Sequence, residues 1–263
     1  MKKIKLELSY ENLEPVILKV SKNIELSEPE KDLLKRACIY SICDNHTGKM
    51  QDLKSISTSC KDNAQCAKNA AVPDSICKNC FSMSMHEIYG DNFYNKLHLN
   101  TLLYSVAVLP VDVLPELRNI QYFRLEAFGD LNNSIQAANY FNIAKKNIKN
   151  RVRLALWTKN PRFIDQAIKA GYKKPSNINI VYSSLFLNNN GGAGIMKKYS
   201  FIDKVFTVYT LEYLKEHPEI KINCGARDCF ACGRCYKKGG DPVVNEMLKS
   251  DQKKAIKEGY TIK

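Results

Sequence analysis

The stretch QYFRLEAFGDLNNSIQAANYFNIAKKNIKNRVRLALWTKNPR, residues 121–162, decides the fold class of this chain. It begins with the predicted strand QYFRLEAF, which ends at Gly129-Asp130, and it closes with an apolar predicted strand, VRLALW, followed by Thr158. Between them Asn132 or Asn133 is placed to cap a helix. The apolar residues of that helix recur on one face, at Ala137, Phe141, Ala144 and Ile148. Two strands joined by such a helix indicate a parallel βαβ unit.

The same alternation of strand and helix extends in both directions. Upstream, residues 3–9 and 49–59 are predicted strands, and Ser27-Glu28-Pro29-Glu30 opens a helix that runs to about Ser41. Residues 85–106 have helical character. Downstream, Asn160-Pro161 opens a helix that Gly171 ends. Further strands are predicted at 177–187, 204–210 and 220–224.

Six or seven strands separated by helices predict an α/β fold with a parallel sheet. Both a partial (β/α) barrel and a doubly wound sheet satisfy this pattern, and either gathers its chemistry at the carboxyl ends of the strands. The length of 263 residues and the 44% hydrophobic content suit a single domain. We expect a partial-barrel core over residues 49–222, followed by a metal-binding segment and a helix over 223–263.

Eight of the ten cysteines fall into two compact sets, which predict cysteine-rich metal-binding loops. The first set is Cys60, Cys66, Cys77 and Cys80, and the second is Cys224, Cys229, Cys232 and Cys235. The second set reads C-x4-C-x2-C-x2-C, a spacing that lets each thiolate reach a different iron of a 4Fe-4S cluster. The first set reads C-x5-C-x10-C-x2-C, which iron–sulfur clusters and zinc can both use. One or two iron–sulfur clusters are therefore expected, with zinc as the alternative.

Cellular context favours metal sites over disulfides. The amino terminus has no continuous apolar segment and no small-residue cleavage site, so we expect a cytoplasmic protein with reduced thiols. The longest apolar stretch, residues 102–117, is interrupted by prolines and acids, which argues against a membrane span. Cys38 and Cys43 are interpreted as ordinary thiols.

A formal charge of +13 favours polyanionic partners. The densest basic segment lies within residues 145–162 and contains no acid. Its cations are Lys145, Lys146, Lys149, Arg151, Arg153, Lys159 and Arg162. Nucleic acid is a candidate partner through this surface, although a basic balance by itself indicates only non-specific binding.

Four short motifs occur in a specific order: Cys60, Cys66 and Cys80-Phe81, then FRLEAFGD, then LALWTKNP, then DCFACGRCY. This order resembles a phage- and plasmid-borne family of cysteine-rich proteins named after "gene product eighty-eight", over about residues 50–236. The chain departs from the family pattern at Phe128, where the family has Ser, and at Phe81-Ser82, where it has Tyr-Ala.

That family is remotely similar to the radical S-adenosylmethionine enzymes, which implies a partial barrel with a three-cysteine cluster loop after the first strand. The resemblance places Gly129 and Asp130 at a cofactor-binding motif, with Asp130 and Lys159 as catalytic candidates that meet an amine and an anionic group. Cys77 departs from the three-cysteine pattern, because a fourth thiolate closes the iron on which S-adenosylmethionine binds.

Two function classes follow. The first is an iron–sulfur protein of a phage or mobile element, located in the host cytoplasm, that acts as a redox or radical enzyme on or near nucleic acid. The alternative is a zinc-bearing nucleic-acid-binding module with no catalysis, in which both cysteine sets are structural.

Overall fold

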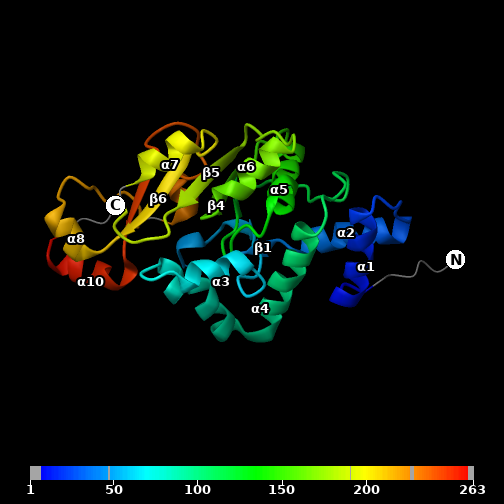
Figure 1. The fold of residues 1–263 in the computed structure, drawn as a ribbon, viewed down its shortest axis with the longest axis horizontal. Helices are drawn as coiled ribbons and strands as arrows, with labels where there is room; N and C mark the ends of the chain where they lie inside the picture. The colour runs from blue at the N-terminus through cyan, green and yellow to red at the C-terminus, as the bar shows by residue number, and fades with distance from the viewer. Residues whose placement is uncertain (1–6, 47, 190, 226–227, 260–263) are drawn as a thin grey trace.

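Seven strands form one sheet in a computed structural model of the protein, which describes residues 7–46, 48–189, 191–225 and 228–259 (Figure 1). The strands are β1 (Cys43–Asp44), β2 (Lys54–Ile56), β3 (Tyr122–Leu125), β4 (Arg153–Thr158), β5 (Ile178–Ser183), β6 (Lys204–Tyr209) and β7 (Val243–Met247). β1 pairs antiparallel with β2, and every later pair is parallel. Their spatial order follows the chain without a reversal. The predicted α/β class with a parallel sheet is confirmed, whereas the doubly wound order is not found.

Ten α-helices occur in the described residues, with two 3-10 helices, η1 (Gly48–Met50) and η2 (Ile76–Asn79). The α-helices are α1 (Tyr10–Ser21), α2 (Glu28–Tyr40), α3 (Ala64–Ala71), α4 (Phe81–Ser105), α5 (Ser134–Lys146), α6 (Pro161–Lys169), α7 (Gly192–Lys198), α8 (Leu211–Glu216), α9 (Cys229–Cys232) and α10 (Lys249–Lys257). None of the described helices combines the length and the hydrophobicity that a membrane span needs.

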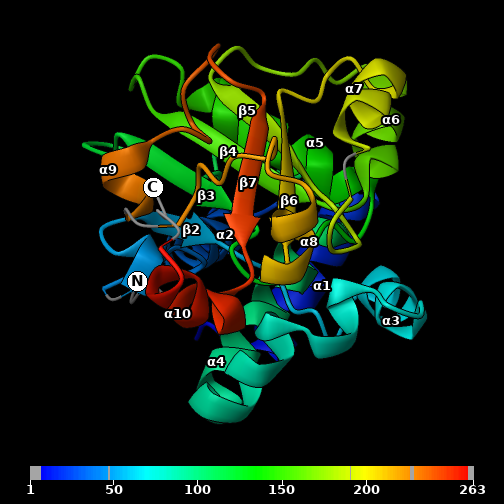
Figure 2. The same cartoon turned by 90° about the vertical axis from the view of Figure 1, so that its left-hand side faces the viewer.

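The two faces of the sheet bury different partners because strand residues alternate in direction. Phe123 and Leu125 of β3 join the main hydrophobic core, to which α1, α2, α4, α5 and α6 contribute. Tyr122, the strand residue directly before Phe123, packs on the opposite face with Tyr236 of the C-terminal segment. Figure 2 shows α5, α6 and α7 on the right of the strands and α9 on the left. The helices and the C-terminal cysteine loop therefore cover opposite faces.

Local sequence signals explain where several helices begin. Ser27 and Glu30 form the expected capping box of α2. Asn133 caps α5 by accepting from the backbone N–H of Gln136 at 3.0 Å, and Pro161 is the first residue of α6. Ile148, expected on the face of α5, lies beyond its end and is exposed.

Three expectations need correction. The strand predicted at 3–9 falls mainly outside the described residues, its described part, 7–9, forms no strand, and α1 follows at once. The strand predicted at 220–224 is wrong, because Cys224 makes only an isolated bridge to Glu246 and the true edge strand is β7. The sheet thus extends into the 223–263 segment. Of the strand predicted at 49–59, β2 alone forms.

Candidate metal centre

The first cysteine set occupies the carboxyl end of β2, next to the carboxyl end of β3. After β2 the segment 57–59 is fully buried, and Ser57 Oγ accepts the backbone N–H groups of Ala127 and Phe128, both at 3.1 Å. Asn100 of α4 donates from Nδ2 to the Ser57 carbonyl at 2.8 Å. These bonds fix the start of the cysteine loop against α4 and the segment that follows β3. The loop thus lies at the carboxyl end of a strand, where the sequence places it.

Gly129 lies against this loop at a distance that excludes a side chain. Its φ is +78°, and a Cβ at this position would stand 2.3 Å from the carbonyl oxygen of Thr58. Its backbone N–H donates to Ser82 Oγ at 3.3 Å. Glycine is needed here because the two loops touch through their backbones.

Two of the four thiols are direct neighbours. Interaction between the Cys60 and Cys80 thiols lowers the pKa of Cys80 and raises that of Cys60, and Cys60 Sγ lies 3.4 Å from the Met83 sulfur. Cys80 is the N-cap residue of α4, and the backbone N–H groups of Met83 and Ser82 further lower its pKa. The amino terminus of a helix stabilises a thiolate, and the thiolate is the form of cysteine that binds metal.

Local caps hold the other two cysteines. Asn63 Oδ1 accepts the backbone N–H of Cys66 at 3.2 Å, and Ser75 Oγ accepts that of Cys77 at 3.0 Å. Burial raises the pKa of both thiols, and the Cys66 thiol is raised further by the charges of Asp130 and Cys80. Cys80 therefore lies within electrostatic reach of the other three thiols, with Cys66 in α3 and Cys77 in η2.

Asp130 is buried, and its carboxylate accepts hydrogen bonds from four donors. Its Oδ1 accepts from the hydroxyl of Thr158 at 2.6 Å and from the backbone N–H of Leu131 at 2.7 Å. Its Oδ2 accepts from the backbone N–H of Lys159 at 2.9 Å and from Nδ2 of Asn160 at 3.2 Å. Burial raises the pKa of this carboxyl, and the Lys159 charge opposes the shift.

Lys159 lies at the same end of the sheet. Its ammonium donates to Ser183 Oγ at 3.0 Å, at the end of β5, and its charge lowers the pKa of Cys77 against the effect of burial. The structure thus brings together Cys60, Cys66, Cys77, Cys80, Gly129, Asp130 and Lys159.

Sequence reasoning missed Glu126, which lies beneath this site. It is 2% exposed, with φ at +58°, a left-handed conformation that is uncommon for a residue other than glycine. Its Oε1 accepts from Gln136 Nε2 at 2.6 Å and from the hydroxyl of Tyr140, and its Oε2 accepts from Thr58 Oγ1 at 3.0 Å. Burial raises its pKa to about 8. The sequence signal that could have identified Glu126 is an acid directly after FRL, within the predicted strand.

The second cysteine set packs on the other face of the sheet, apart from α5 and α6. Cys224, Cys229 and Cys235 contact the hydrophobic cluster that contains Tyr122 and Tyr236. Asp228 caps α9, and Gly233 ends it at φ +60°. Cys235 is held by its carbonyl, which accepts from Asn179 Nδ2 at 3.0 Å. The four cysteines gather here because α9 is a single tight turn.

Cations accompany the second set. Lys49 Nζ lies 3.2 Å from Cys224 Sγ and also pairs with Glu246. The guanidinium of Arg124 stacks on Trp157, with 4.2 Å from Cζ to the ring centroid. Burial raises the pKa of Cys235 to about 12, and Arg124 acts against this shift. These positive charges favour thiolates, the form that a cluster needs.

The donor chemistry of both sets fits an iron–sulfur cluster. Within the described residues, no group of three or more His, Cys, Asp or Glu side chains is close enough to hold one metal ion. A cubic cluster bonds each thiolate to a different iron, so its ligands stand further apart than those around a single ion. Cys80 lies beside Cys60 at the first site, and Cys224 is near enough to raise the pKa of Cys235 at the second.

The basic segment does not form one surface, because β4 divides it. Lys149 and Arg151 precede β4 and are exposed at the amino end of the sheet, whereas Lys159 follows β4 at the carboxyl end. Lys146 is occupied, because its ammonium donates to backbone carbonyls that include Leu114 at 2.6 Å. Nucleic acid remains a predicted partner.

No family model, curated protein or solved structure matches this chain. The similarity to the "gene product eighty-eight" family therefore stays a prediction that rests on four short motifs.

Proposed function

We propose that the protein is an iron–sulfur protein with a radical-enzyme-like centre at the carboxyl end of its sheet. The observation that carries the proposal is the convergence of Cys60, Cys66, Cys77 and Cys80 around Cys80, at the amino terminus of α4. Cys60 is buried and the other three are half-buried, at the end of the sheet where α/β enzymes place their chemistry.

The arrangement of the sheet supports a partial (β/α) barrel as part of the same proposal. β2 to β7 are parallel and follow chain order, as barrel strands do, and α5 and α6 lie on the face that would be outside. The second cysteine set then lies on the inner face, where an auxiliary cluster would hold the C-terminal segment against the strands.

The residues of the first site have distinct roles in this proposal. The cysteines hold the cluster, Asp130 fixes the turn that follows β4, and Lys159 presents an ammonium beside Cys77. When bound, a cluster with one open iron supplies an electron to S-adenosylmethionine. The resemblance adds an origin in a phage or mobile element.

Metal content tests the proposal directly. Protein purified without oxygen should be brown, with a broad visible absorbance and matching amounts of iron and acid-labile sulfide. Cys60→Ser should lower the iron content, whereas Cys43→Ser, which removes a thiol outside both sets, should leave it unchanged. Colourless protein that contains zinc and no iron would contradict the proposal in favour of the zinc-bearing module.

A further inference from the structure

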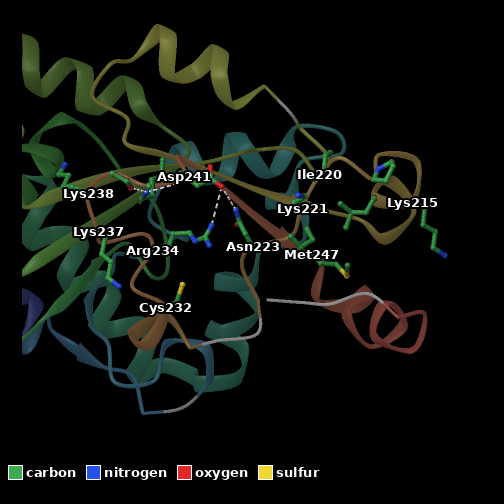
Figure 3. Close-up of a pocket in the computed structure, with 16 residues that line it drawn as sticks. Lys215, Ile220, Lys221, Asn223, Cys232, Arg234, Lys237, Lys238, Asp241 and Met247 are labelled. Carbon is green, nitrogen blue, oxygen red and sulfur yellow. Dashed lines mark hydrogen bonds and ion pairs between the residues drawn. The ribbon is translucent and has the colours of Figure 1, made fainter.

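A hollow of about 890 Å³ lies in the C-terminal part of the molecule, apart from the first cysteine set (Figure 3). α8, the segment 218–223 and the loop 237–241 bound it, and Met247 at the end of β7 lines it. Its volume lies in the range of small-molecule sites. Apart from Cys232, a member of the second cysteine set, the lining residues have no role in the predictions made from sequence.

The lining is strongly cationic. Asp241 is its one carboxylate among the described residues, against six cations: Lys204, Lys215, Lys221, Arg234, Lys237 and Lys238. Such an imbalance in a concave surface concentrates anions, because low-dielectric walls focus the field.

Several of these cations are available to a ligand. Lys204 is 2% exposed, and its Nζ donates to the carbonyls of Gly239 and Asp241 at 3.1 and 3.2 Å, which fixes it at the wall. No ion pair or side-chain hydrogen bond joins the ammonium of Lys221 or Lys237 to any other described residue. Arg234 comes no nearer than 3.9 Å to Asp241. A doubly charged anion would satisfy donors that the fold leaves open.

The lining also contains apolar groups. Figure 3 shows Arg234 and Lys237 toward one end, and Met247, Ile220 and Lys221 toward the other. The apolar lining residues are Leu214, Pro218, Ile220, Ile222 and Met247. An occupant should therefore have an anionic part and a flat or apolar part.

We propose that this hollow binds a mononucleotide, with its phosphates at Arg234 and Lys237 and its base against Ile220 and Ile222, beside Lys221. A phosphate chain is the anion that such clustered donors recognise, and a base provides the apolar face. A nucleic-acid strand would need a groove that follows several phosphates, whereas these cations line a single hollow. The site needs no metal.

Displacement of a fluorescent adenosine triphosphate analogue from the purified protein tests this site at near-physiological salt, about 150 mM. Lys221→Gln combined with Lys237→Gln should weaken binding at least about tenfold, because the lining loses two of its six cations. The matched control, Lys35→Gln with Lys149→Gln, removes two exposed charges away from the hollow and should change the affinity less than about twofold.

A second variant tests the apolar end. Ile220→Ser should weaken displacement by adenosine triphosphate about threefold or more, with no change in displacement by pyrophosphate. The proposal is overturned if the analogue does not bind, or if the control variant loses as much affinity as the pocket variant. It is also overturned if pyrophosphate competes as well as adenosine triphosphate, or if a single-stranded oligonucleotide outcompetes both, which would indicate a strand-binding surface.

Discussion

The carboxylate of Asp130, directly after β3, accepts a 2.6 Å hydrogen bond from the hydroxyl of Thr158, the last residue of β4. Three further donors, from Leu131, Lys159 and Asn160, complete its contacts. A carboxylate has about four acceptor sites, so these four donors occupy the hydrogen-bonding capacity of Asp130. Asp130 thus positions Lys159, whatever ligand the centre binds.

Asp130→Asn should lower the free energy of unfolding by about 2 kcal/mol, because the new NH2 group faces donors and leaves at least one of them unpaired. Urea unfolding at neutral pH measures the change. Asp165→Asn is the control, since Asp165 pairs with Lys169 on the surface of α6 and should cost no more than about 0.5 kcal/mol. Equal losses in the two variants would refute the positioning role.

Gly129→Ala should destabilise the protein by about 3 kcal/mol or more, because a positive φ and a clash with the Thr58 carbonyl add together. Gly171→Ala separates the two causes. Gly171 also has a positive φ, +96°, but a Cβ there meets nothing within 4 Å, so its cost should be about 1 kcal/mol. Similar melting temperatures for the two variants would show that residue 129 does not lie against Thr58.

Glu126 should make stability depend on pH. Burial raises its pKa from the ordinary 4.5 to about 8, so ionisation costs more in the folded protein than in the unfolded chain. The free energy of unfolding should therefore fall as pH rises from about 4.5 towards about 8, and it should level off above.

Glu126→Gln mimics the neutral carboxyl and should flatten this slope in urea titrations between pH 5 and 8. Glu87→Gln, at an exposed position in α4, should leave the slope intact. A slope that persists in Glu126→Gln would assign the dependence to another group.

The sequence was most informative where one local interaction determines an element. Ser27, Asn133 and Pro161 begin α2, α5 and α6, and these starts depend on the side chain of one residue. β7 was missed and the strand at 220–224 was wrong because both segments could pair with β6. The pairing of Val205 with Val243 decides between them, and it is a long-range contact that no local pattern shows.

At the candidate site, too, the sequence predicted local features and missed those that depend on long-range contacts. Cysteine spacing grouped Cys60 with Cys80, and the strand-end rule placed Asp130 near them. Cysteine spacing could not show that the Asp130 carboxylate accepts a hydrogen bond from Thr158 of β4, nor that Glu126 is buried beneath the cysteines. Both facts depend on which loops contact each other. The cationic hollow also escaped notice, since Lys204 and Lys221 lie in separate segments.

The number of committed thiolates at the first site decides between an enzyme and a scaffold. Lys159 lies near Cys77 and lowers its pKa, whereas Cys60 and Cys80 form a direct pair. If Cys60, Cys66 and Cys80 hold the cluster, Cys77→Ser should retain both the iron content and the visible colour. Cys66→Ser, the matched variant, should lose them.

An open iron should also respond to its cofactor. S-adenosylmethionine should then change the electron paramagnetic resonance spectrum of the reduced protein, both in the wild type and in Cys77→Ser. Lys159→Met should weaken this response without lowering the iron content, because the ammonium is not a ligand. If Cys77→Ser loses its iron and the wild-type spectrum ignores S-adenosylmethionine, all four thiolates are committed. The radical-enzyme centre would then be wrong, and a structural or electron-transfer cluster would replace it.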